Sequence, residues 1–465
     1  MNRIRKIVAF FICLTAYGLL APVSIAQRVG FINGADGSVL DEVEQSGGKY
    51  YDNGMEKDAL TIFKEHGFNT LRLKLWHTPA DQFNSLPNVM VMARRAKEKG
   101  FQFLLDIHYS DTWADPGHQA KPAAWEGLSF DVLSDSIYEY TKHVIFALKA
   151  QNTLPDYVQV GNEISCGMLW NDGRICGEFA NEAQWQKFAT LVKKGIQGVH
   201  DALSQSEQVK IVIHYDNGAN NIGSQWFFSN LLNHGVDFDI IGLSYYPWWH
   251  GTLTALQDNL NDLASRYNKD IMLVEGGYPW TLARADNTNN IVGSEDQLLP
   301  GYPATVAGQK AFLTQVLQIV KNIPGNRGRG FIYWSPEWIP DHPGSPWENV
   351  TLFDFGGEAL ESMRVFENQT GIGENSVGQY LVNVSCFPNP FTVKTTVSFT
   401  VSRRGDVDLR IVDPLGGEVF IRKMNDLIPG SHSLVWQPDH LAPGVYLCII
   451  VAGNKTYPLK IILKD

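Results

Sequence analysis

The chain has 465 residues, of which 44% are hydrophobic and 19% charged, so it is long enough for one large globular domain and a smaller second one. Its formal net charge of −11 argues against a polyanionic partner such as nucleic acid, whose binding requires a basic surface. No later stretch reaches the ~18 consecutive apolar residues that a membrane span needs.

Residues 1–26 have the pattern of a secretory signal peptide. Arg3, Arg5 and Lys6 form a basic start, an apolar stretch follows, and the small residues "SIA" precede Gln27. Removal of this segment takes away three positive charges and no acids, so the net charge becomes −14. We therefore expect an exported protein.

Eight short β-rich runs recur before residue 340, with stretches of helical pattern between them. The runs are residues 28–34, 69–76, 101–110, 157–163, 210–216, 239–246, 270–276 and 328–334. Several are almost continuously apolar, as is typical of strands that are covered on both faces. The alternation predicts an α/β fold, a (β/α)₈ TIM barrel over residues 27–368. An open doubly wound sheet is the alternative, but no glycine-rich dinucleotide motif follows the first run.

Polar residues stand at the C-terminal ends of these predicted strands. They are Asp36, Arg72, His108, Asn162 with Glu163, His214, Tyr245, Glu275 and Trp334. In a (β/α)₈ barrel these ends surround one opening, where the active site lies. A single polar residue of this kind most often only caps a strand, whereas eight in register predict a site. A register slip by one residue would turn any of these side chains away.

Two of these strand ends carry a glutamate, Glu163 and Glu275. Two carboxyl groups across a cleft are the usual machinery for breaking a glycosidic bond, with one protonated to help the leaving oxygen and the other ionised. Asn162, next to Glu163, is suited to hydrogen-bond a sugar 2-hydroxyl. The pattern predicts a glycoside hydrolase.

The remaining strand-end residues fit supporting roles around the two glutamates. Arg72, His214 and Tyr245 are suited to orient the carboxyls and to separate their pKa values. Trp334 is suited to form a floor for a sugar ring. For Arg72, a structural ion pair below the opening is the alternative interpretation.

Residues 29–368 resemble glycoside hydrolase family 53, the endo-β-1,4-galactanases. The motifs that carry the resemblance are "KYYDNGMEKDALTIFKEHGFNTLRLKLW", "DIHYSDTWADPGHQAKPAAW", "QVGNEISCGMLW", "YYPWWHGTL", "VEGGYPW" and "YWSPEWIP". The resemblance implies a secreted enzyme that hydrolyses β-1,4-galactan, in arabinogalactan and pectic side chains, with retention of configuration. By the same resemblance Glu163 is the acid/base and Glu275 the nucleophile. Gly276 departs from the family, which usually has a larger residue after the nucleophile.

The resemblance also implies further contacts around the cleaved bond. The strand-end positions that it marks are Arg72, His108, Asn162, His214, Tyr245 and Trp334. Two loops are expected to add sugar contacts, one through Asp111, Trp113 and Trp125 and the other through Trp248, Trp249 and His250. For each loop tryptophan, packing within the loop is the alternative.

We expect no metal and no cofactor. Some members of the family bind calcium in the loop between the seventh and eighth strands, here residues 281–309. However, Asp286, Asn287 and Asn289 fit no strict ligand spacing, so a solvated loop is the favoured interpretation. Cysteine pairing stays open: Cys166 and Cys176, like Cys386 and Cys448, fit either a disulfide or two free thiols.

Residues 369–379 are rich in glycine, asparagine and serine and are interpreted as a linker, and alternating runs in residues 380–465 predict a small β-sandwich. This module resembles the sorting domain of the type IX secretion system, on "CFPNPF" and the ending "LAPGVYLCIIVAGNKTYPLKIILKD". The resemblance implies a bacterial protein that is secreted or held at the cell surface, with the secretion machinery as a partner. A carbohydrate-binding module is the alternative, although Trp436 is the only tryptophan there.

Two other functions compete with a galactanase that acts as a monomer on a polysaccharide. One is another retaining barrel endo-glycanase, such as a mannanase, cellulase or xylanase, and the family-specific loop motifs argue against it. The other is an inactive surface glycan-binding protein, which has no need of both Glu163 and Glu275.

Overall fold

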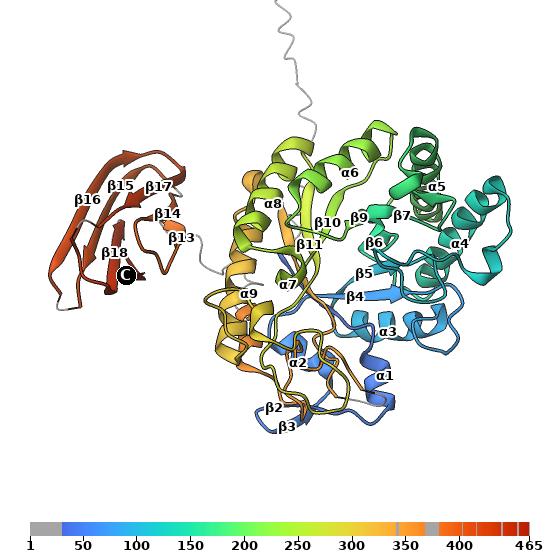
Figure 1. Ribbon diagram of the computed structural model, residues 1–465, viewed down its shortest axis with the longest axis horizontal. Helices are drawn as coiled ribbons and strands as arrows, with labels where there is room; N and C mark the ends of the chain where they lie inside the picture. The colour runs from blue at the N-terminus through green and yellow to red at the C-terminus, as the bar shows by residue number, and fades with distance from the viewer. Residues whose placement is uncertain are drawn as a thin grey trace, which may run out of the picture. The chain divides into compact units, whose positions relative to one another are not determined.

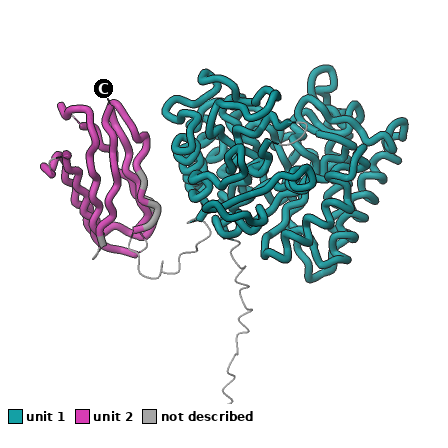
Figure 2. The backbone as a smooth tube through the Cα atoms, turned by 90° about the horizontal axis from the view of Figure 1, so that it is seen from below, with its two compact units in different colours: residues 1–370 teal, residues 371–465 magenta. Residues whose placement is uncertain are grey.

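The computed structural model describes residues 30–340, 344–367, 381–401, 403–414, 416–438, 440–452 and 455–464. The predicted signal peptide and linker lie outside these ranges. The chain forms two compact units, residues 1–370 and 371–465 (Figure 2). Among the described residues, no helix is long and apolar enough to cross a membrane.

The first unit is a closed barrel of eight parallel strands, as predicted. Its strands are β1 (Ile32–Asp36), β4 (Thr70–Leu75), β5 (Gln102–Ile107), β6 (Tyr157–Val160), β9 (Lys210–Tyr215), β10 (Ile240–Tyr245), β11 (Asp270–Gly276) and β12 (Gly328–Tyr333). They are joined in the order β1-β12-β11-β10-β9-β6-β5-β4, and β1 closes the barrel by pairing with β4. Short hairpins, β2 (Tyr50–Asp52) with β3 (Met55–Lys57) and β7 (Gly167–Met168) with β8 (Gly173–Arg174), lie in the connections.

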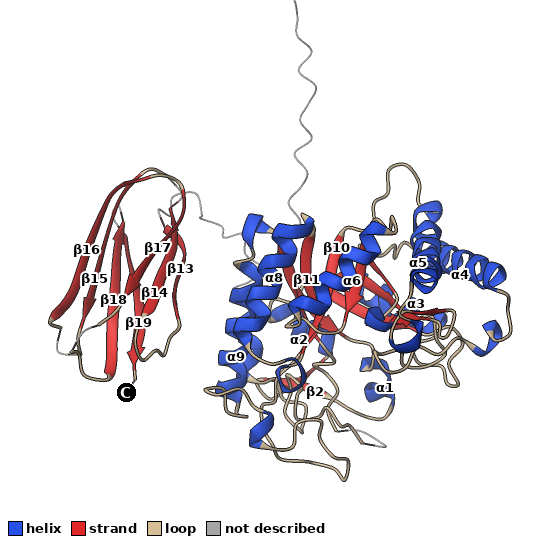
Figure 3. Ribbon diagram, turned by 45° about the horizontal axis from the view of Figure 1, so that its top comes forward, coloured by secondary structure: helices blue, strands red, loops and turns tan. Residues whose placement is uncertain are grey.

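Helices surround the strands (Figure 1, Figure 3). They are α1 (Leu40–Gln45), α2 (Ala59–Glu65), α3 (Leu86–Glu98), α4 (Phe130–Ala150), α5 (Glu182–Ala202), α6 (Asn221–Asn233), α7 (Pro247–His250), α8 (Leu253–Tyr267) and α9 (Val306–Lys321). Side-chain oxygens cap the first turns of several, such as Asp58 at α2, Asn181 at α5 and Thr305 at α9. Short 3₁₀ turns are η1 (Ala123–Trp125), η2 (Ile164–Cys166), η3 (Gly177–Phe179), η4 (Glu295–Gln297), η5 (Pro324–Asn326) and η6 (Glu361–Phe366).

The interior of the barrel has an apolar layer below a polar one. The apolar layer is a cluster separate from the core between strands and helices, made of Ile32, Leu104, Tyr157, Val212, Ile240, Met272, Val274 and Ile332. Because successive side chains of a strand alternate between its two faces, the residue two positions later points the same way. Those positions hold Asp106 after Leu104, Gln159 after Tyr157 and His214 after Val212. The polar layer therefore lies toward the C-terminal ends of the strands.

The pairing of β10 with β11 contains a register shift. Leu243 pairs with Leu273, but the next residue, Ser244, pairs with Glu275. The extra residue on β11 leaves Ser244 opposite Glu275 and moves both toward the polar layer. Such bulges commonly re-aim a side chain beside an active site.

The second unit is a sandwich of two antiparallel sheets. Its strands are β13 (Leu381–Phe387), β14 (Thr395–Val401), β15 (Gly405–Val412), β16 (Glu418–Leu427), β17 (Gly430–Trp436), β18 (Gly444–Ala452) and β19 (Lys455–Leu463). One sheet has the order β13-β14-β17 and the other β16-β15-β18-β19. Their inner faces enclose a core that includes Trp436.

The four cysteines of the described residues fall into two cases. Cys166 and Cys176 form a disulfide in the connection after β6. Cys386 and Cys448 are free thiols in the sandwich, so the pairing considered from sequence is not present there. The Cys386 sulfur instead contacts Oγ1 of Thr395 at 3.0 Å.

Candidate active site

A cleft of about 560 Å³ opens at the C-terminal ends of the barrel strands. Its polar lining includes Glu163 and Glu275, and aromatic rings cover much of the remaining wall. These aromatic residues are Trp113, Tyr246, Trp249, Trp334, Trp338 and Trp347. A cleft with apolar walls and a few convergent polar groups is the form that small-molecule and sugar sites take.

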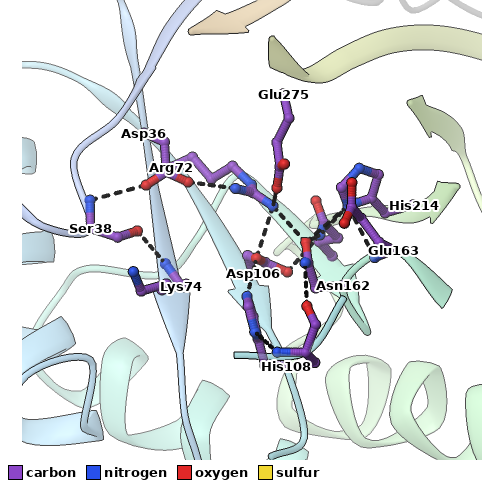
Figure 4. A network of polar contacts seen from close by, with 12 residues as sticks. Asp36, Ser38, Arg72, Lys74, Asp106, His108, Asn162, Glu163, His214 and Glu275 are labelled. Carbon is purple, nitrogen blue, oxygen red and sulfur yellow. Dashed lines mark hydrogen bonds and ion pairs between the residues drawn. The ribbon is translucent and has the colours of Figure 1, made fainter. Parts of the chain in front are cut away.

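Arg72 on β4 is the centre of the charged network at the bottom of the cleft (Figure 4). Its Nη1 donates to Asp36 Oδ2 at 2.5 Å, and its Nη2 lies 2.8 Å from Asp106 Oδ2 and 2.7 Å from Glu275 Oε1. Burial alone would lower the pKa of Arg72, but the three carboxylates raise it above its ordinary value. The guanidinium therefore stays charged and fixes Glu275 from below.

The hydrogen-bond network orients Asn162. Its Oδ1 accepts from Arg72 Nη2 at 2.9 Å, so its Nδ2 is the donor and one of the two hydrogens goes to the Ala114 carbonyl at 2.8 Å. The other hydrogen is available on the cleft side. His108 is oriented in the same way, because its Nδ1 accepts from the Ala114 N–H at 3.1 Å and its Nε2 donates to Asp106 at 2.9 Å.

Glu163 follows β6 with a left-handed backbone, at φ 45° and ψ 52°. A non-glycine residue in this region carries strain, and such positions concentrate at functional sites. The turn directs the Glu163 N–H to His214 Nδ1 at 3.3 Å and brings the carboxyl oxygen Oε1 to 2.6 Å from Ser244 Oγ. Gln119 Nε2 holds the same turn by donating to the Asn162 carbonyl at 2.8 Å.

The carboxyl groups of Glu163 and Glu275 face each other with different partners. One oxygen of each lies within 4.8 Å of the other. Burial and the charge of Glu275 raise the pKa of Glu163 well above its ordinary value. Burial also raises the pKa of Glu275, but contact with Arg72 limits the rise to about 7. Glu163 is therefore the better proton carrier of the two.

His214 stands beside the two carboxyls, and one of its ring nitrogens lies within the same 4.8 Å. A divalent cation needs lone pairs directed at one point, whereas Arg72 already donates to Glu275 at 2.7 Å and would repel a cation there. The donor set fits a hydrogen-bonded acid pair better than a metal centre.

In the loop after β11, the side-chain oxygens of Asp286 and Asn289 are engaged within the protein. Both carboxylate oxygens of Asp286 accept backbone N–H groups, from Thr288 at 2.6 Å and Ser345 at 3.0 Å. Asn289 Oδ1 accepts from Arg284 at 2.7 Å. Among the described residues, no three acidic or histidine side chains of this loop converge.

Most of the residues predicted from sequence meet in this site. Arg72, His108, Trp113, Asn162, Glu163, Glu275 and Trp334 line the cleft, and His214 lies directly behind it. Trp113 is held from one side by Lys74, whose Nζ lies 3.6 Å from the ring centroid, and burial lowers the pKa of Lys74 to about 8. Trp334 packs on Trp347 with ring centroids 4.4 Å apart.

The prediction that Tyr245 contributes to the site is wrong, because its side chain does not reach the cleft. Its hydroxyl donates to the Gly251 carbonyl at 2.8 Å and its ring stacks on Phe312. The following residue, Tyr246, takes the expected place and donates to Glu275 Oε2 at 3.2 Å. Side chains alternate along β10, so Tyr246 faces the same way as Ser244, whereas Tyr245 faces away from the cleft.

Two loop residues also lie outside the cleft lining. Asp111 uses both carboxylate oxygens on backbone N–H groups, from Thr78 at 2.9 Å and Ala123 at 2.8 Å, and so ties two loops together. Trp248 packs on Trp347, whereas Trp249, expected from the same loop, lines the cleft.

The sequence interpretation missed several polar residues of the site: Asp106, Gln159, Ser244 and Tyr246. The first two lie inside strands rather than at their ends. A charged or amide side chain within an apolar run was the available signal, because such residues are depleted in strands.

Comparison with known proteins identifies both units. Residues 32–366 match the model of Glycosyl hydrolase family 53, and residues 385–464 match the Secretion system C-terminal sorting domain. A protein of Niallia circulans described as "Uncharacterized protein in bgaB 5'region" is 50% identical over 357 residues, which is 74% of this chain and 96% of the relative. The arabinogalactan endo-beta-1,4-galactanase of Cellvibrio japonicus is 36% identical over 361 residues, covering 75% of this chain and 93% of the relative.

The Ignisphaera aggregans GH53 catalytic domain is similar in structure, with a TM-score of 0.68 and 40% identity, over 74% of this chain and 97% of that one. The sorting domain identifies the protein as a bacterial one that is secreted or held at the cell surface. The chain belongs to glycosyl hydrolase family 53 and is a glycoside hydrolase.

Proposed function

We propose that the protein is an endo-β-1,4-galactanase that cleaves β-1,4-galactan, as in arabinogalactan and pectic side chains, with retention of configuration. Relatives that carry the name arabinogalactan endo-beta-1,4-galactanase support the substrate. The observation that carries the mechanism is the close approach of the two carboxyl groups, of which one oxygen of Glu163 and one of Glu275 lie within 4.8 Å of each other. Retaining glycosidases need ~5–5.5 Å, because one carboxylate attacks the sugar carbon directly.

In this mechanism Glu275 is the nucleophile and Glu163 the acid/base. Arg72, 2.7 Å away, favours the ionised form of Glu275, whose oxygen attacks the anomeric carbon. As the glycosidic bond breaks, Glu163 transfers its proton to the leaving oxygen. The product of this step is a glycosyl ester on Glu275 and a shortened chain.

In the second step Glu163, now a carboxylate, accepts a proton from water. The water oxygen attacks the anomeric carbon from the face that the leaving group has vacated, and Glu275 departs as a carboxylate. Two inversions give net retention, and Glu163 has regained its proton. The free Nδ2 hydrogen of Asn162 is suited to bind the sugar 2-hydroxyl in both steps.

Reducing-end release from galactan, mannan, xylan and soluble cellulose tests the substrate assignment. We expect release from galactan, and loss of at least about a thousandfold in both Glu163→Gln and Glu275→Gln. Glu178→Gln, at an exposed position in η3, is the matched control and should keep wild-type activity. Release from another glycan would indicate a different endo-glycanase, and binding without release would indicate a glycan-binding protein.

Proton NMR of the first product tests the stereochemistry. Retention predicts that the newly formed reducing end is initially the β anomer. An initial α anomer would mean direct attack by water, which the short carboxyl separation disfavours.

A further inference from the structure

A directed chain of hydrogen bonds runs from His214 through Ser244 to Glu163. Nδ1 of His214 accepts from the backbone N–H of Glu163 at 3.3 Å, so it carries no hydrogen of its own. Gln159 Nε2 has two hydrogens and three acceptors in range: Asp106 Oδ1 at 2.6 Å, His214 Nδ1 at 2.9 Å and Asn162 Oδ1 at 3.0 Å. Burial and nearby Arg72 lower the pKa of His214 well below its ordinary value, so the ring is neutral with its hydrogen on Nε2.

The His214 tautomer fixes the direction of the Ser244 hydroxyl. Nε2–H of His214 lies 2.8 Å from Ser244 Oγ, which must accept it. The single hydrogen of Ser244 is then available to one carboxyl. Glu163 Oε1 is at 2.6 Å and Glu275 Oε2 at 3.5 Å, so the hydrogen goes to Glu163.

Each carboxyl thus has donors of its own. Glu275 receives Arg72 Nη2 on Oε1 at 2.7 Å and the Tyr246 hydroxyl on Oε2 at 3.2 Å. Glu163 receives Ser244 on Oε1. Since Oε1 of Glu163 accepts a hydrogen bond, the transferable proton belongs on the other oxygen, Oε2.

We propose that Ser244 is a positioning residue for the acid/base: it holds Oε1 of Glu163, leaves Oε2 to carry the catalytic proton, and stabilises the carboxylate form that accepts a proton from water. The proposal rests on the role of Glu163 under Proposed function. A hydroxyl is suited to this task, because it can donate to the carbonyl oxygen of an acid and donates more strongly to a carboxylate. His214 keeps the hydroxyl from rotating away, and both side chains are fully buried.

The charged and titratable groups that face Glu163 come from several elements. They are Asp216 and His214 at the end of β9, Ser244 and Tyr246 from β10 and the residue after it, Glu275 on β11, and Arg72 on β4. Burial, Glu275 and Asp216 favour the protonated form of Glu163, whereas Ser244 and Arg72 favour the carboxylate. Loss of the Ser244 donor therefore shifts Glu163 toward the protonated form.

The pH dependence of kcat/KM on soluble β-1,4-galactan tests this. The basic limb of the profile reports the deprotonation of Glu163 in the free enzyme. In Ser244→Ala we expect this limb to move to higher pH by about one unit, since a hydrogen bond to a charged group contributes that much. Ser244→Cys, whose thiol is a weaker donor of similar size, should give a smaller shift in the same direction, and Ser244→Thr, which keeps the hydroxyl, should retain the wild-type limb. A basic limb in Ser244→Ala that is unmoved or moves to lower pH would overturn the proposal, even if the rate falls.

A second measurement follows the same proton without turnover. Full-length protein labelled with [δ-13C]glutamate is titrated by NMR, and the Glu163 signal is the one lost in Glu163→Gln. The midpoint should be higher in Ser244→Ala than in the wild type, and equal midpoints would overturn the proposal. If the wild type does not cleave galactan, or if Glu163→Gln remains active, the proposed function fails instead, and the NMR titration still decides whether Ser244 donates to Glu163.

Discussion

Tyr245 and Tyr246 send their hydroxyls to opposite sides of the barrel wall. Tyr246 donates to Glu275 Oε2 at 3.2 Å, whereas Tyr245 donates to the Gly251 carbonyl at 2.8 Å, away from the cleft. Burial and the two glutamates raise the pKa of Tyr246 well above its ordinary value, so its hydroxyl is a hydrogen-bond donor at neutral pH. Two adjacent residues of the same type thus offer a matched pair of variants.

Tyr246→Phe should lower kcat/KM on galactan by roughly 10- to 100-fold. The hydroxyl donates to a charged group, and such a bond contributes ~1.5–3 kcal/mol. Tyr245→Phe removes the same atom from the neighbouring position and should leave kcat/KM near the wild-type value. Equal losses in the two variants would contradict the assignment of Tyr246 to Glu275.

Arg72→Met should destabilise the barrel unit by about 3–5 kcal/mol, measured by urea unfolding. The change leaves Asp36, Asp106 and Glu275 buried without their common cation, and an uncompensated buried charge has a cost of that order. Arg94→Met, at an exposed position on α3, is the control and should change stability little. An effect of Arg72→Met no larger than that of the control would contradict the network.

The pH profile of kcat/KM should be bell-shaped, with both limbs above the range of an ordinary glutamate. Activity is lost as pH falls through the pKa of Glu275, which must be ionised, and as pH rises through that of Glu163, which must be protonated. The raised pKa values of both groups move both limbs upward. In Glu163→Gln the residual activity should have no basic limb, and a basic limb that persists would assign that proton to another group.

We expect Glu337 to make the stability of the protein, rather than its catalytic rate, depend on pH. It is fully buried, and neither carboxyl oxygen makes a hydrogen bond of ordinary geometry within the described part of the chain. Burial raises the pKa of Glu337 well above its ordinary value. At any pH between its pKa in the unfolded chain and its higher pKa in the folded protein, the folded protein therefore holds one more proton than the unfolded chain. The free energy of unfolding therefore decreases as pH rises through that range.

Glu337→Gln should remove this contribution, so that the free energy of unfolding varies less between about pH 5 and pH 7 and is higher at pH 7. Thermal or urea unfolding at several pH values measures it. Glu126→Gln, at an exposed position, should keep the wild-type dependence. A variant at position 337 with unchanged pH dependence would mean that the folded protein holds Glu337 ionised.

The positions of the strand ends predicted most of the cleft lining, because the C-terminal ends of parallel strands meet on one side of the barrel. Arg72, His108, Glu163 and Glu275 were found in this way. Tyr245 was assigned to the wrong face, because the prediction took the last residue of the strand and did not apply the alternation that places Ser244 and Tyr246 on the cleft side.

The loops were harder to predict. Trp338 and Trp347 line the cleft but come from the connection after β12, where no periodicity assigns a face. Asp111 and Trp248 lie in loops with family-specific sequences, yet their side chains hold the loops together and do not line the cleft. Which loop residues reach the cleft is decided by tertiary packing.

The bridge between Cys166 and Cys176 begins three residues after Glu163. Disulfides persist in oxidising compartments and are reduced in the cytoplasm. The segment next to the acid/base therefore becomes covalently closed only once the chain has been exported. The redox state of this cysteine pair therefore distinguishes exported from retained molecules: free thiols at positions 166 and 176 would identify molecules that have not been exported.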